Sequence, residues 1–166
     1  MRTCRRVARA DAARWAPSSY NAQPWRMLYA LRSSASWSLF FELPLEGNKA
    51  WARNAAALAL FVSRKTNDRT GQTSITHSFD AGAAWGYFAL RGSMLGYAVH
   101  GMQGFDYARA QRDLGIPRDF RVEAMIAVGR PAPRESLPAA LQAREFPSDR
   151  RELSETVCEG KWALGG

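Results

Sequence analysis

The chain has 166 residues, of which 46% are hydrophobic and 11% aromatic. That is enough for one domain with its own core, and far too many aromatics for a disordered basic tail. No apolar run approaches the roughly 20 residues that span a bilayer, and the Ala/Arg-rich start lacks the apolar core of a secretory signal, so we expect a cytoplasmic protein without a membrane partner. A mitochondrial transit peptide, also rich in arginine, is the less favoured alternative.

The formal net charge of +8 raises the question of nucleic-acid binding. The arginines are scattered over both ends of the chain, with no Lys/Arg stripe among exposed aromatics and no zinc-finger or RNA-recognition signature. We therefore expect no nucleic-acid partner. The sharper alternative is that some arginines hold a phosphate, because a guanidinium group matches phosphate oxygens in a two-point fork.

Cysteine and histidine are too few and too dispersed for a disulfide framework or a metal site. Cys4 and Cys158 lie at opposite ends of the chain, and neither belongs to a CxxC pair, so we expect two free thiols. The only histidines, His77 and His100, belong to no cluster with zinc-like spacing.

The first half of the chain is predicted to contain two helices and two strands. Residues 5–15 suit a short helix that ends before Pro17, because proline pushes the preceding residue out of the helical region. Residues 25–32 suit a strand. A turn at Gly47 and Asn48 is expected to precede a short helix, and residues 57–63 read as a buried strand.

The second half contains the most regular helix, predicted over residues 77–96 and stopped by Gly96. Its apolar residues recur at helical spacing, namely Phe79, Ala83, Tyr87, Leu90 and Met94. A short strand over 97–100, a helix capped by Asp106, and a buried strand over 121–129 follow. This irregular alternation of helices and strands predicts an α+β or mixed α/β class.

Residues 131–166 form a tail with little periodicity and four prolines. A segment of this length without a core of its own usually packs on something else, and a partner subunit is the natural candidate.

The segment with the most chemical content is residues 12–26, AARWAPSSYNAQPWR. A proline-bounded turn follows the helix and carries Pro17, Ser18, Ser19, Asn21 and Gln23. Hydroxyl and amide groups both donate and accept, which suits a ring with alternating carbonyl and imino groups. The alternative, which spacing alone favours, is a helix exit where Ser and Asn bond to their own backbone.

The string itself closely resembles the nitroreductase signature "AArWAPSSxNxQPWrf". Further segments resemble that family in order: residues 46–55, residues 80–84 ("DxGxA"), residues 100–106 ("hxmxGFD"), residues 126–132 ("iGxPa") and residues 147–162. Several have plainer explanations when taken alone, since Asp80 could cap a helix and Gly104 could serve a tight turn. The ordered series makes coincidence implausible.

The resemblance implies a nitroreductase-like mixed sheet flanked by helices in an intertwined homodimer, with flavin mononucleotide (FMN) at the interface. The Pro17–Gln23 turn would lie against the flavin. The loop of Met102, Gln103 and Gly104 would face its N5 edge through backbone groups, and Arg150 or Arg151 would reach the phosphate.

The implied activity is a two-step electron transfer from NAD(P)H, through FMN, to a nitroaromatic, a quinone or a similar acceptor. The rival expectation is a flavin-poor structural or binding homologue that has lost the reaction. It rests on the start of the sequence, which does not reproduce the basic "RRSxRxF" motif that holds the phosphate in the family. This departure predicts a shortened N-terminus, a weakly held flavin or no flavin.

Overall fold

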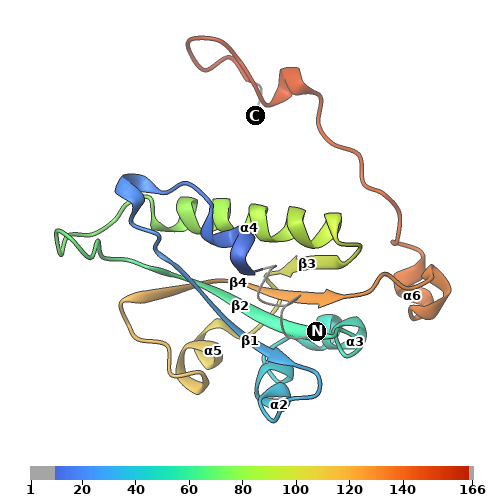
Figure 1. Ribbon diagram of the computed structural model, residues 1–166. Coiled ribbons are helices and arrows are strands. Elements are labelled where there is room, and N and C mark those ends of the chain that lie inside the picture. Colours follow the sequence, from blue (N-terminus) through green and yellow to red (C-terminus); the bar gives the residue numbers. More distant parts are fainter. Residues whose placement is uncertain (1–9, 165–166) are drawn as a thin grey trace. The chain divides into compact units, whose positions relative to one another are not determined.

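A four-stranded antiparallel sheet forms the centre of the computed structural model, which describes residues 10–164 (Figure 1). Its strands lie in the order β1-β2-β4-β3. Their bounds are Trp25–Leu31 for β1, Ala57–Arg64 for β2, Ala98–Met102 for β3 and Phe120–Gly129 for β4. The α+β class is confirmed. All three pairings among the described strands are antiparallel, so the parallel pairing of the expected mixed sheet is not among them.

The two faces of the sheet carry separate apolar cores because successive strand residues point to opposite sides. On one face, Leu58 and Leu60 of β2 pack with residues of α2 (Trp37–Phe41), α3 (Glu46–Ala52) and α5 (Tyr107–Asp113). On the other face, Ala59 and Phe61 pack with α4 (His77–Met94). Figure 1 shows α4 on one side of the sheet and α2 and α5 on the opposite side.

Helix α4 forms where predicted, and Gly96 follows it with φ 73°, a left-handed conformation that favours glycine. The predicted apolar spacing, however, marks its outer face. Phe79 is 80% exposed and Met94 70%, whereas the face toward the sheet consists of Asp80, Ala81, Ala84, Phe88 and Gly92. Small residues bring the helix close to the sheet: a Cβ at Gly92 would meet the Val99 side chain.

Two other local predictions need correction. Gly47 and Asn48 lie inside α3 and not in a turn before it. Helix α2 was not predicted, because its five residues are too short for a helical period to show. Of the predicted helix at residues 5–15, the described part is helical over residues 10–14, and Val7 lies outside the described residues.

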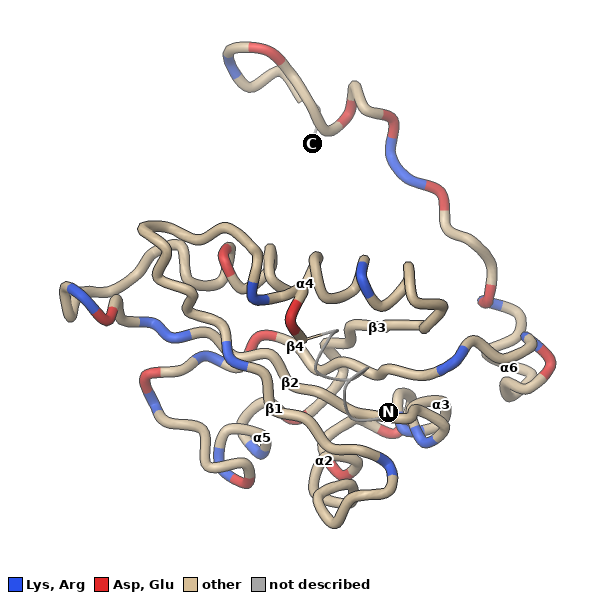
Figure 2. Tube along the Cα trace, in the orientation of Figure 1, with Lys and Arg blue, Asp and Glu red and all other residues tan. Residues whose placement is uncertain are grey.

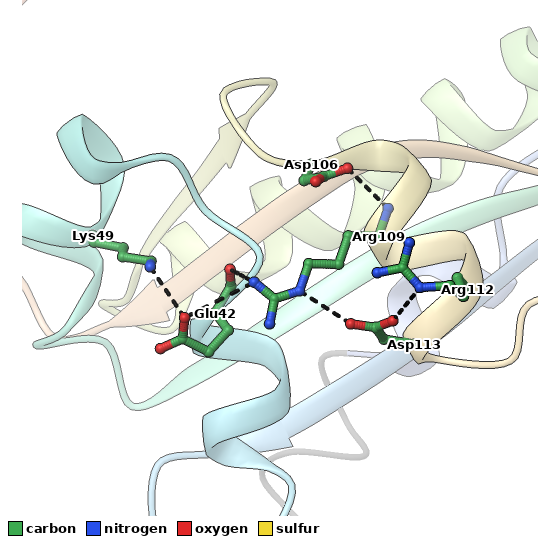
Figure 3. Close-up of polar contacts among 6 residues, drawn as sticks. All are labelled: Glu42, Lys49, Asp106, Arg109, Arg112 and Asp113. Atoms are coloured by element: carbon green, nitrogen blue, oxygen red, sulfur yellow. Dashed lines mark hydrogen bonds and ion pairs between the residues drawn. The ribbon is translucent and has the colours of Figure 1, made fainter.

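Charged side chains connect the three helices on the α2/α3/α5 face (Figure 3). Lys49 of α3 pairs with Glu42 after α2 (3.3 Å), and Arg109 of α5 donates to the Glu42 carbonyl (3.1 Å) and to Asp113 (3.0 Å). Hydrogen bonds from Arg109 and then Arg112 lower the pKa of Asp113, while the Glu46 and Glu42 carboxylates raise the pKa of Lys49. The network fixes how these helices meet around the segment that joins α2 to α3.

The chain divides after residue 132, and the unit beyond it has only short helical turns. These are η2 (Arg134–Ser136), α6 (Ala139–Gln142) and η3 (Leu153–Glu155). None of their residues is buried, and Trp162 is 81% exposed. Cys158 is a free, exposed thiol as predicted, and Cys4 lies outside the described residues. No helix among residues 10–164 is long and apolar enough to cross a membrane.

Candidate functional site

The Pro17–Gln23 turn is held in an unusual backbone conformation. Three non-glycine residues have positive φ, namely Tyr20 (50°), Asn21 (55°) and Gln23 (46°). The Ser18 hydroxyl accepts the Gln23 N–H (3.0 Å), and the Gln23 amide donates to the Asn21 carbonyl (3.2 Å) and to its side-chain oxygen (3.0 Å). Such conformations cost free energy and cluster at functional sites. The side chains of the turn therefore bond within the turn, as the alternative of a simple helix exit predicts. The backbone of the turn is also strained, which a simple helix exit does not require.

The turn is attached to the first turn of α4. The Ser19 N–H donates to the Asp80 carboxylate (3.2 Å), which also accepts the Thr76 hydroxyl (3.2 Å). Asp80 is only 4% exposed. Pro17 and Asn21 are exposed, and Ser18, Ser19 and Gln23 are half-buried. The turn thus exposes part of its polar surface, and its Ser19 N–H is bonded to Asp80 of α4.

The Met102–Gly104 loop leaves the end of β3 and is held by α3 and the segment before it. The Gly104 carbonyl accepts both the Leu45 N–H (2.9 Å) and the Asn48 side-chain amide (2.9 Å). Trp51 donates to the Asn48 side-chain oxygen (3.3 Å). Met102 is buried and Gln103 exposed. The exposed Gln103 therefore lies between two anchored residues, the buried Met102 and the hydrogen-bonded Gly104.

The Gly104 N–H is one backbone donor in this loop that is left over among the described residues. The Gln103 carbonyl accepts the Phe105 N–H (2.9 Å) in a tight turn around Gly104. In a trans peptide the N–H points opposite to the carbonyl, so the Gly104 N–H points away from that turn. Within residues 10–164 it has no hydrogen-bond acceptor. A half-buried N–H without a partner is a donor available to a ligand, such as the N5 atom of a flavin.

Arg150 and Arg151 belong to the unit that begins at residue 133. Arg150 donates to the carbonyls of Ser148 (2.9 Å) and Asp149 (3.0 Å), and Arg151 lies 3.4 Å from the Glu155 carboxylate. These exposed contacts are weak enough to be exchanged for a phosphate. The predicted phosphate role stays a prediction, because the structure describes this unit by itself.

The predicted site residues thus form three separate groups. Among the described residues, no hydrogen bond, ion pair or ring contact joins the Pro17–Gln23 turn to the Met102–Gly104 loop. Sequence reasoning missed the supporting residues: Asn48 and Trp51 behind the loop, and Asp80 in its contact with the turn. Asn48 and Trp51 lie in the segment 46–55 that resembles the family, but without an assigned role, and Asp80, a carboxylate in the first turn of a helix, suggested only a cap.

The comparisons with known proteins identify the family of the chain. Residues 8–130 match the profile of the Nitroreductase family. The chain belongs to the nitroreductase family. A Streptomyces coelicolor protein, whose name places it with the NADH dehydrogenase/NAD(P)H nitroreductases, is 28% identical over 141 residues, which cover 74% of this chain and 69% of the relative.

Solved structures extend the likeness to the whole nitroreductase fold. A crystal structure of an oxidoreductase containing FMN is 43% identical, with a TM-score of 0.92, covering 96% of this chain and 82% of that one. A Desulfovibrio desulfuricans protein in complex with FMN is 23% identical, with a TM-score of 0.68, covering 93% and 82% of the two chains. This second likeness shows the fold alone.

We expect that Gly104→Ala destabilises this nitroreductase-family protein by about 1–2 kcal/mol. A Cβ at this position would lie 2.6 Å from the Asn48 amide nitrogen and would push it off the Gly104 carbonyl. Urea unfolding measures the loss. Gly47→Ala is the matched control, because a Cβ there meets open space. A Gly104→Ala variant as stable as the wild type would show that the Asn48 contact does not hold the loop.

Proposed function

We propose that this protein is an FMN-dependent oxidoreductase that passes electrons from NAD(P)H to a nitroaromatic, a quinone or a similar electron-poor acceptor. The observation that carries the proposal is the Gly104 N–H, a donor without an acceptor in residues 10–164, on a loop held by Asn48 of α3. Family membership supports the proposal. The names of two similar proteins also support it, because one is described as an oxidoreductase containing FMN and the other is named as an NAD(P)H nitroreductase.

The residues present fit a flavin. The Gly104 N–H would donate to its N5 edge, and the hydroxyl and amide groups of Ser18, Ser19, Asn21 and Gln23 would bond to its ring and ribityl chain. FMN, when bound, supplies the hydride-transfer chemistry. The protein's part is to orient the ring and leave one face open, so that donor and acceptor use the same pocket in turn. This division explains why the proposal needs no acid, base or nucleophile from the protein.

We further propose that the active form is a homodimer. The outer face of α4 presents Phe79, Leu90 and Met94, which are 80%, 64% and 70% exposed. In water such a row of apolar side chains favours association. The Pro17–Gln23 turn and the Met102–Gly104 loop are not joined within one chain, which supports a flavin that receives them from different protomers. Residues 131–166 would pack on the partner subunit and bury Trp162.

Purified protein should bind added FMN, and anaerobic NADH or NADPH should then bleach the visible flavin band. A nitroaromatic or a quinone should restore the band, because it takes the electrons and reoxidises the flavin. Absorbance spectroscopy follows both steps. Protein that rejects FMN would support the flavin-poor homologue instead, and protein that binds FMN but is not reduced by either nicotinamide would overturn the choice of donor.

The dimer should persist at micromolar concentration in equilibrium sedimentation. Leu90→Glu should convert it to monomer, because a charge would then be buried in the α4 contact. Leu39→Glu, at a leucine of α2 that is 42% exposed and lies off this face, should leave the dimer intact. A well-folded wild-type monomer at this concentration would remove the proposal.

Binding of the FMN phosphate group should depend on Arg150 and Arg151. A charge-assisted hydrogen bond to a phosphate contributes roughly 1.5–3 kcal/mol, so the double variant Arg150→Ala/Arg151→Ala should lose at least about tenfold in FMN affinity. Affinity for riboflavin, which has no phosphate, should change much less. Fluorescence titration of both flavins against both proteins is the measurement. Equal losses for the two flavins would make the arginines structural.

A further inference from the structure

We propose that Asp80 is a positioning residue that holds the Pro17–Gln23 turn in its strained conformation and thereby shapes the flavin-facing surface. The expected effect on flavin binding rests on the proposed function. The contact between Asp80 and the turn does not, because it is present in the protein without flavin. Asp80 lies 61 positions from its backbone partner Ser19 in the sequence, so only the fold brings them together.

The carboxylate of Asp80 accepts hydrogen bonds from the N-cap residue of its own helix and from the distant Pro17–Gln23 turn. A carboxylate in the first turn of a helix usually accepts a backbone N–H of that turn. Within residues 10–164, the one backbone N–H that the Asp80 carboxylate accepts is that of Ser19 at 3.2 Å, and it also accepts the Thr76 hydroxyl at 3.2 Å. Asp80 is only 4% exposed, and a buried polar group of this kind is costly unless it is hydrogen-bonded.

The first turn of α4 is itself held rigidly against the sheet. The Ser78 hydroxyl donates to Glu123 of β4 (2.7 Å), and the fully buried Ser63 of β2 donates to the same carboxylate oxygen. The Ser63 hydroxyl also forms a hydrogen bond with His77 Nδ1, 2.6 Å away. Two of these contacts, Ser78 with Glu123 and His77 with Ser63, therefore attach the start of α4 to the sheet, and Asp80 reaches the turn from that helix start.

The turn needs such an anchor because its own hydrogen bonds are local. They join Ser18 to Gln23 and Gln23 to Asn21, and therefore fix the shape of the turn without fixing its place. The positive φ values of Tyr20, Asn21 and Gln23 favour relaxation to another conformation once the restraint is removed. The Asp80 carboxylate thus joins the strained turn to the start of α4.

The experiment compares three variants by hydrogen exchange in the absence of flavin. Asp80→Ala removes the acceptor and should raise exchange of the residue 19–23 amides by at least about tenfold. Asp80→Asn keeps an acceptor oxygen and should restore most of the protection. Thr76→Val removes only the other bond to the same oxygen and is the control for a weakened helix start. Unchanged protection in Asp80→Ala, or an equal loss in Thr76→Val, would overturn the proposal.

A second variant covers the case in which Asp80→Ala does not fold. Ser19→Pro deletes the donor and leaves α4 untouched, and Ser18 before it is already extended (φ −151°, ψ 154°), as proline requires. Amides 21–23 should then exchange faster, and unchanged exchange would overturn the proposal.

FMN titration separates this inference from the proposed function. Asp80→Ala should weaken binding by about tenfold, with Asp80→Asn close to wild type. Wild-type protein that binds no FMN would defeat the proposed function while the exchange result still decides the role of Asp80. Equal FMN affinity of wild type and Asp80→Ala would defeat only the role of Asp80.

Discussion

Burial of strand β2 on both faces is the constraint on which the rest of the structure depends. Its residues from Leu58 to Ser63 are all no more than 3% exposed. A strand of this kind must be central and must have a covering layer on each side, since burying each large apolar side chain contributes about 1.5–3 kcal/mol. Helix α4 supplies one layer, and α2, α3 and α5 supply the other. The candidate site follows from this division, because each of its two loops is attached to a different layer.

The two layers hold their loops by the same physical means. In each case a polar side chain from a helix meets a backbone group of the loop: Asp80 the Ser19 N–H, and Asn48 the Gly104 carbonyl. A single hydrogen bond of this kind contributes only about 1 kcal/mol, but it fixes a direction that apolar packing cannot fix. The loops themselves remain polar and partly exposed, and so are free to bind a ligand. Such a division, in which helices hold the loops and the loops bind the ligand, is typical of sites built on a rigid scaffold.

Charge plays a smaller and more local part than the net value of +8 suggests. Lys and Arg are spread along the described chain and interspersed with Asp and Glu (Figure 2). Several of the arginines have carboxylate partners, such as Arg64 with Asp119 (2.9 Å), whose pKa the Thr66 hydroxyl and the Arg64 guanidinium lower. The ion pairs of Figure 3 join Lys49 of α3 and Arg109 of α5 to Glu42, which follows α2. This fits the expectation that the protein has no nucleic-acid partner, which remains a prediction.

The sequence alone determined the strands, the long helix, the family and the α+β class. Hydrophobic period, the Gly96 stop and the Asp106 cap are local signals, and the Asp106 carboxylate indeed accepts the Arg109 N–H (2.8 Å). The tertiary structure decided which face of α4 is buried, because small residues such as Ala84 and Gly92 permit close packing that a row of large apolar residues would prevent. It alone placed Asp80 beside Ser19 and Asn48 beside Gly104. Contacts between residues 61 and 56 positions apart leave no periodic trace in a sequence, since they depend on how the layers meet.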